Sequence, residues 1–183
     1  MQELTDQQLY SALQYAKSQD ENAGRAMLEQ FQNNQPALAH TILGIFPSMI
    51  AEKDQNMAYL FMDLCFDVLC VFQNAFGALP TQQSMGVDWI EKFAGLLGAE
   101  LQSFMTDQPM DSKIRNQLQD RFAGRMIDSN AQTGLVNFMN LSIDQYVAEY
   151  RPSIEAVRIS KTMIFVVIQL FEAIYNQSGP IKH

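Results

Sequence analysis

Two aspartates stand in the otherwise apolar run LFMDLCFDVLC, at residues 60–70. Asp63 and Asp67 are four residues apart, so on a helix they lie one turn apart on the same face. Carboxylates in this arrangement can bind a cation, pair with basic side chains or anchor a polar group of a ligand. The plain alternative is that they mark the line along which a mostly buried helix touches water.

A second polar stripe follows the last long apolar segment and includes Arg158 and Lys161. If the two stripes faced each other, they would enclose a polar pocket in which Asp63 and Asp67 pair with these two cations. The interpretation we favour is a solvated edge or structural ion pairs, and the pocket is the alternative.

Metal catalysis at these aspartates would need more ligands than the sequence offers. Helical enzymes that hold metals add a second acidic motif or Glu-x-x-His on other helices, and neither pattern occurs here. His40 and His183 are the only histidines, which argues against catalytic triads and histidine-bound metals. Gly-rich nucleotide-binding loops are also missing. We expect no catalytic residue, no metal and no cofactor, and keep a metal-dependent helical enzyme as a third alternative.

Basic residues gather in one place, at residues 113–125. Arg121 and Arg125, in RFAGR, lie one helical turn apart and could clamp an anion or a carboxylate of a partner chain. The alternative, which we favour, is an ordinary solvated face.

The elements that must position these residues are predicted to be helical throughout. No Asn-Gly or Asp-Gly hairpin turn occurs. Thr5, Asp20 and Asp54 are each placed to cap a helix, and Pro36 suits the first turn of another. Pro47 is expected to end or kink the helix that begins at Pro36.

The predicted fold is all-α, a single-domain bundle of about seven to nine helices. Two helices, at about 54–79 and 153–177, are apolar nearly all round and are expected to be central. The domain is expected to cover residues 1–177, with a disordered tail at 178–183.

Composition restricts the partners. Acids outnumber bases by 20 to 12, for a net charge of −8, so we expect neither nucleic acid nor an anionic membrane as a general partner. Cys65 and Cys70 cannot bridge within one helix and suit a reducing compartment. The opening MQELTDQQLY lacks the features of a signal peptide. We therefore expect a cytoplasmic protein.

The chain is also rich in large adaptable apolar residues, with 11 methionines and 12 phenylalanines. We predict a non-enzymatic helical protein that acts through protein–protein contact and self-associates as a homo-oligomer. The alternative is a binder of a hydrophobic small molecule in an inter-helical cavity, with Asp63 and Asp67 as polar anchors and Arg158 and Trp89 as further ligand-binding candidates.

Overall fold

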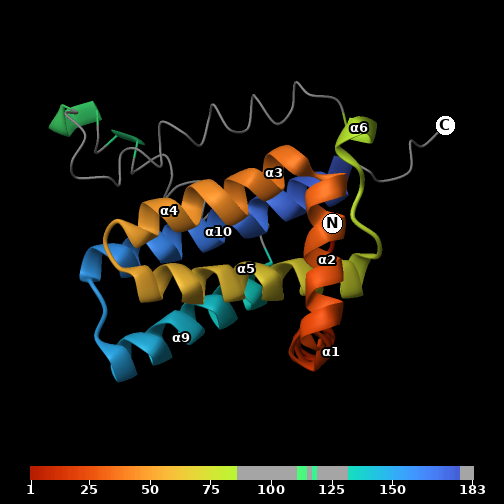
Figure 1. Ribbon diagram of the computed structural model, residues 1–183, viewed down its shortest axis with the longest axis horizontal. Coiled ribbons are helices and arrows are strands. Elements are labelled where there is room, and N and C mark those ends of the chain that lie inside the picture. The colour runs from red at the N-terminus through yellow and green to blue at the C-terminus, as the bar shows by residue number, and fades with distance from the viewer. Residues whose placement is uncertain (86–110, 115–116, 119–131, 178–183) are drawn as a thin grey trace.

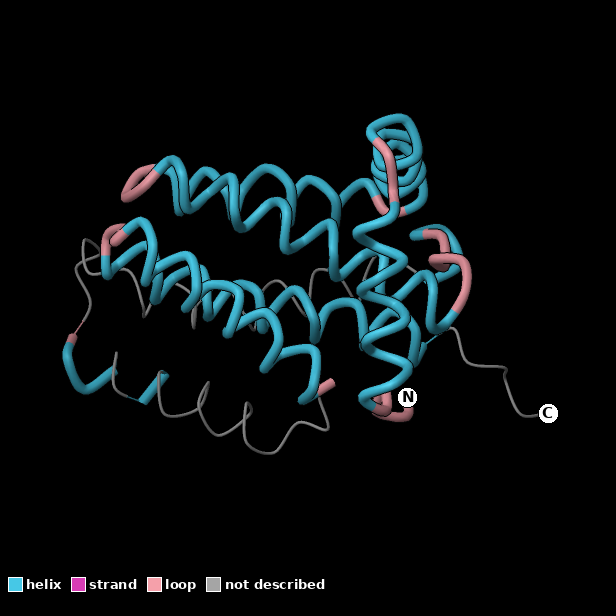
Figure 2. Tube along the Cα trace, turned by 90° about the horizontal axis from the view of Figure 1, so that it is seen from below, coloured by secondary structure: helices cyan, strands magenta, loops and turns pink. Residues whose placement is uncertain are grey.

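The computed structural model describes residues 1–85, 111–114, 117–118 and 132–177. Eight α-helices and one π-helical turn lie within these residues, and no strand does, which confirms the predicted all-α bundle. The helices are α1 (Asp6–Ser18), α2 (Glu21–Asn34), α3 (Pro36–His40), α4 (Phe46–Ala51), α5 (Gln55–Phe76), α6 (Gln82–Met85), α9 (Thr133–Tyr150) and α10 (Ile154–Gln177), with the π-helical turn η1 (Thr41–Ile45) between α3 and α4. Figure 2 shows short loops between successive helices from α1 to α6 and between α9 and α10.

The two apolar helices are central, as predicted. α5 and α10 pack against each other, α1 and α4 pack on α5, and α9 packs on α10 (Figure 1). Ten of the 22 residues of α5 are buried, and in α10 every residue from Thr162 to Ile168 is buried. Hydrophobic burial of this kind is the main stabilising contribution to a helical bundle.

Local capping explains where the helices begin. The Thr5 side chain accepts a hydrogen bond from the N–H of Gln8, whose side chain accepts from the N–H of Thr5 in return. The Asp20 side chain caps α2 by accepting a hydrogen bond from the N–H of Ala23, at 2.8 Å. Both caps stand where the sequence predicts them.

Asp54 does more than cap α5. One carboxylate oxygen, Oδ1, accepts the N–H groups of Asn56 and Met57, at 3.0 and 3.1 Å. The other oxygen, Oδ2, accepts the N–H of Ser153, at 3.2 Å. The same side chain therefore starts α5 and holds the beginning of α10 beside it.

The far ends of these two helices are joined by aromatic rings. Phe72 of α5 stacks on Phe171 and Tyr175 of α10, with ring centroids 5.3 and 5.7 Å apart. The Tyr175 hydroxyl donates to the carbonyl of Gly77, at 2.8 Å, directly after the end of α5. Phe31 of α2 completes the cluster, 5.7 Å from Phe171. The aromatic cluster thus fixes α2 against the two central helices.

Pro47 does not end its helix. The chain remains helical from Pro36 to Ala51, and the π-helical turn η1 ends at Ile45, two residues before the proline. A proline lacks the N–H that would bond to the carbonyl four residues earlier. The wider π turn accommodates that missing bond without breaking the helix.

One helix among the described residues, α5, is long and apolar enough to cross a bilayer by length and composition. Core helices of globular bundles meet the same two criteria. Here α5 lies in contact with α1, α4 and α10.

Candidate functional site

Asp63 and Asp67 line an open groove of about 700 Å³ where α1, α2 and α5 meet. The three helices run in different directions. In Figure 1, α1 is seen nearly end-on, α2 stands upright and α5 lies across the view. Crossing helices cannot stay in contact along their whole lengths, so a wedge of space opens beside the crossing point. The two aspartates project into this wedge from α5.

The floor of the groove is apolar. It is formed by side chains from α2, η1 and α5, namely Leu28, Leu43, Met62 and Phe66. Gly24 of α2 lies close to the Phe66 ring, since a Cβ at Gly24 would stand 3.4 Å from Cζ of that ring. Glycine at this position therefore lets α2 pack closely against the Phe66 side chain.

The carboxylates are partly withdrawn from water. Asp63 is exposed and Asp67 is half-buried. Burial raises the pKa of Asp63, and it also raises the pKa of Asp67. Lys17 lowers the pKa of Asp67 and the neighbouring Asp63 carboxylate raises it. Neither aspartate forms an ion pair within the described ranges. A cationic partner would therefore favour the ionised form of both carboxylates.

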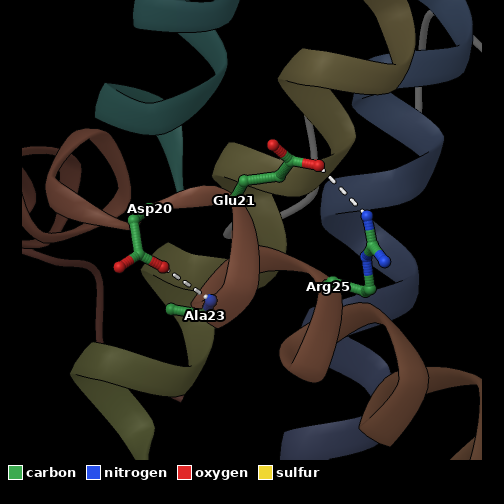
Figure 3. Close-up of polar contacts among 4 residues, drawn as sticks. All are labelled: Asp20, Glu21, Ala23 and Arg25. Carbon is green, nitrogen blue, oxygen red and sulfur yellow. Dashed lines mark hydrogen bonds and ion pairs between the residues drawn. The ribbon is translucent and has the colours of Figure 1, made fainter.

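The rim carries further charges at the beginning of α2. Arg25 donates to Glu21 at 3.0 Å, one turn away on the same helix, while Asp20 bonds to the N–H of Ala23 (Figure 3). The positive charge of Arg25 is thus already matched by Glu21. Lys17, at the end of α1, is the remaining cation that lines the groove.

The two thiols near these aspartates are not reactive groups. Burial raises the pKa of Cys70 to about 12, and the Asp67 carboxylate adds to the shift. Burial also holds the pKa of Cys65 well above its usual range. The Cys70 thiol contacts Sδ of Met27 at 4.0 Å. Protonated thiols are poor nucleophiles and poor metal ligands, so both cysteines act as small core residues.

The structure brings the predicted aspartates together with α1 and α2. No residue of α10 lines the groove. Arg158 is exposed on α10, and Lys161 on the same helix bonds to Asp144 of α9, at 2.6 Å. The groove therefore does not support a pocket between the polar stripes of α5 and α10, because it opens on another side of α5.

Three of the sequence-predicted residues cannot be placed. Trp89, Arg121 and Arg125 lie outside the described residues, as does the 178–183 tail. Among the residues that the structure does describe, no three histidine, cysteine, aspartate or glutamate side chains gather as a metal site would require.

Sequence reasoning missed the residues that complete the groove. Lys17, Leu28 and Leu43 come from segments about 20 to 50 residues before the aspartates, and nothing in their local pattern marks them. Phe66 and Met62 flank the aspartates on α5, and their closeness to Asp63 and Asp67 is the signal that sequence reasoning could have used.

Outside the groove, one buried carboxyl stands out. Glu172 of α10 is buried, and burial raises its pKa from 4.5 to about 7. The backbone N–H of Gln132 opposes the shift, and the Glu3 carboxylate adds to it. In the folded protein this group holds its proton between pH 4.5 and about pH 7, whereas the unfolded chain releases it. Relative to the ionised form, protonated Glu172 therefore makes a favourable contribution to the free energy of unfolding. This contribution is complete below pH 4.5 and is lost as the pH rises through about 7.

Replacing Glu172 by glutamine is expected to stabilise the protein at pH 8 and to leave its stability nearly unchanged at pH 4.5. The expected gain at pH 8 is about 1–2 kcal/mol, after allowance for partial screening by water. Urea unfolding at both pH values measures it. A gain that is the same at both pH values would show that ionisation of Glu172 is not its cause.

Comparisons with protein-family models, with curated proteins and with solved structures give no match for this chain.

Proposed function

We propose that this is a non-enzymatic helical protein that acts through protein–protein contact, and that the groove between α1, α2 and α5 is a contact surface. The observation that carries the proposal is the combination of an open apolar floor, formed with Met62 and Phe66, and two carboxylates that lack an ion pair among the described residues. An apolar patch with a polar rim is the usual anatomy of a protein interface.

The openness of the groove favours a protein over a small molecule. Small-molecule sites bury most of the ligand surface, whereas this groove is open to solvent. A helix laid into a groove needs only one apolar face covered and keeps its polar face in water. Methionine on the floor suits such a partner, because its unbranched side chain adapts to the shape it meets.

A hydrophobic small molecule is the second candidate. The groove volume of about 700 Å³ lies within the range of small-molecule sites. Asp63 and Asp67 would then be the polar anchors. The two candidates differ in what the purified protein retains, namely a second polypeptide or a low-mass compound.

We also propose that the protein self-associates, through a surface outside the groove, at the end of α9 and the beginning of α10. Tyr146 and Tyr150 pack on each other near the end of α9, with ring centroids 4.6 Å apart, and Tyr150 is exposed. Ile154, at the beginning of α10, is 88% exposed. Exposed Tyr150 and Ile154, which are close in sequence at the junction of α9 and α10, favour contact with a second copy.

A photo-crosslinking amino acid placed at Met62, in the cells from which the protein comes, tests the groove as a contact surface. We expect an adduct with another polypeptide from Met62 and none from a control position, Tyr10, which is 67% exposed on α1 and does not line the groove. Equal adducts from both positions, or none from Met62, would contradict the proposal.

A further inference from the structure

The charges around the groove are unbalanced. Four acids line it, against the two cations Lys17 and Arg25. Two of the acids are already engaged, because Glu21 binds Arg25 at 3.0 Å and Asp20 caps α2 (Figure 3). Among the described residues, Lys17 is then the one lining cation left to balance the charges of Asp63 and Asp67, and it does not form an ion pair with either of them. The groove therefore has an excess of negative charge where its two α5 carboxylates stand.

The spacing of these carboxylates matches a helical partner. Asp63 and Asp67 are one turn apart, so their Cα atoms are separated by about 6 Å along the axis of α5. Lysine or arginine residues one turn apart on a docked helix have the same spacing. A helix laid beside α5 would thus place one cation against each aspartate while its apolar residues cover Met62 and Phe66.

We infer that the groove receives a basic amphipathic helix from a different protein, with its cations against Asp63 and Asp67 and its apolar face on the floor. This inference rests on the proposed function and names the chemistry of the partner. A second copy of this chain is a poorer occupant of the groove, because no helix within the described residues carries two cations four residues apart to match Asp63 and Asp67.

A set of three designed peptides tests the inference by fluorescence anisotropy. The first is a labelled peptide of about 16 residues, made of leucine, lysine and alanine, with the leucines on one helical face. The second has the same composition with the leucines spread round the helix. The third keeps the amphipathic pattern and replaces lysine by glutamate. We expect binding of the first peptide only.

Protein variants locate the bound peptide. The double variant Asp63→Asn, Asp67→Asn is expected to weaken binding of the first peptide about tenfold at low salt, which corresponds to two partly screened ion pairs. The matched double variant Glu52→Gln, Glu149→Gln removes the same charge at two exposed positions outside the groove, and is expected to change binding less than about twofold. Circular dichroism of both variants checks that they are folded.

The outcomes separate the inference from the proposed function. If the first peptide binds equally well to both double variants, the inference is overturned. If the glutamate peptide or the permuted peptide binds as well as the first, the inference is also overturned, and crosslinking from Met62 would leave the proposed function standing. If the wild-type protein forms a dimer that Met62→Lys abolishes, the occupant is a second copy and the inference is wrong. If no peptide binds and Met62 gives no crosslink, both fail.

Discussion

Replacing Phe171 by alanine is expected to lower the free energy of unfolding by about 3–5 kcal/mol. Phe171 is fully buried, and it lies where α2, α5 and α10 meet. Its ring contacts Phe72 and Phe31 at centroid distances of 5.3 and 5.7 Å, and neither neighbour can move far enough to fill the space. The loss therefore combines the removed apolar surface with a cavity. Urea unfolding followed by circular dichroism measures it.

A matched control is Tyr59→Ala on α5. Tyr59 is 58% exposed, so its removal leaves no cavity and is expected to cost less than about 1 kcal/mol. Losses of similar size for the two variants would mean that the aromatic cluster is not the centre of the bundle.

Replacing Asp54 by alanine is expected to lower the free energy of unfolding by about 2–3 kcal/mol. The variant loses two capping bonds to Asn56 and Met57 and also the bond to the N–H of Ser153, 99 residues away along the chain. Removing the carboxylate leaves three backbone N–H groups without their acceptor, which is costly where they are screened from water. Urea unfolding again gives the magnitude.

Asp20→Ala is the comparison that isolates the tertiary bond. Asp20 caps α2 through one N–H, that of Ala23, and its loss is expected to cost about 1 kcal/mol. Asp54→Asn keeps one acceptor oxygen for the α5 cap and is expected to fall between the two alanine variants. Equal losses for Asp54→Ala and Asp20→Ala would show that the bond to Ser153 adds nothing to stability.

Helix positions could be predicted because their causes are local. The caps at Thr5, Asp20 and Asp54 are set by side chains within three residues of the N–H groups they bind. The central place of the helices at 55–76 and 154–177 follows from apolar residues on nearly all sides. The segment around Pro47 shows where prediction from local sequence ends. The sequence predicted that Pro47 would end or kink its helix, whereas a π-helical turn before Pro47 keeps the chain helical.

The candidate site could be predicted only in part. The one-turn spacing placed Asp63 and Asp67 on one face of α5, and this face does border a groove. Which helix lies opposite is decided by the directions in which α1, α2 and α10 cross α5, and local patterns do not encode those directions. The groove therefore contains Lys17 and Leu28 in place of the α10 stripe that includes Arg158.

Methionines also divide according to environment. Met57, Met139 and Met163 are fully buried and fill the core, while Met62 is partly exposed beside the aspartates. Methionine therefore fills the core at some positions and stands at the surface at another. Composition alone could not assign each residue to one of these two environments.

Native mass spectrometry of the freshly purified protein, at low and high concentration, tests most directly whether this protein acts by contact with another chain. The proposal predicts a complex with a second polypeptide, of its own mass or another, and no retained compound of low mass. A monomer at every concentration that carries a bound small molecule would contradict it.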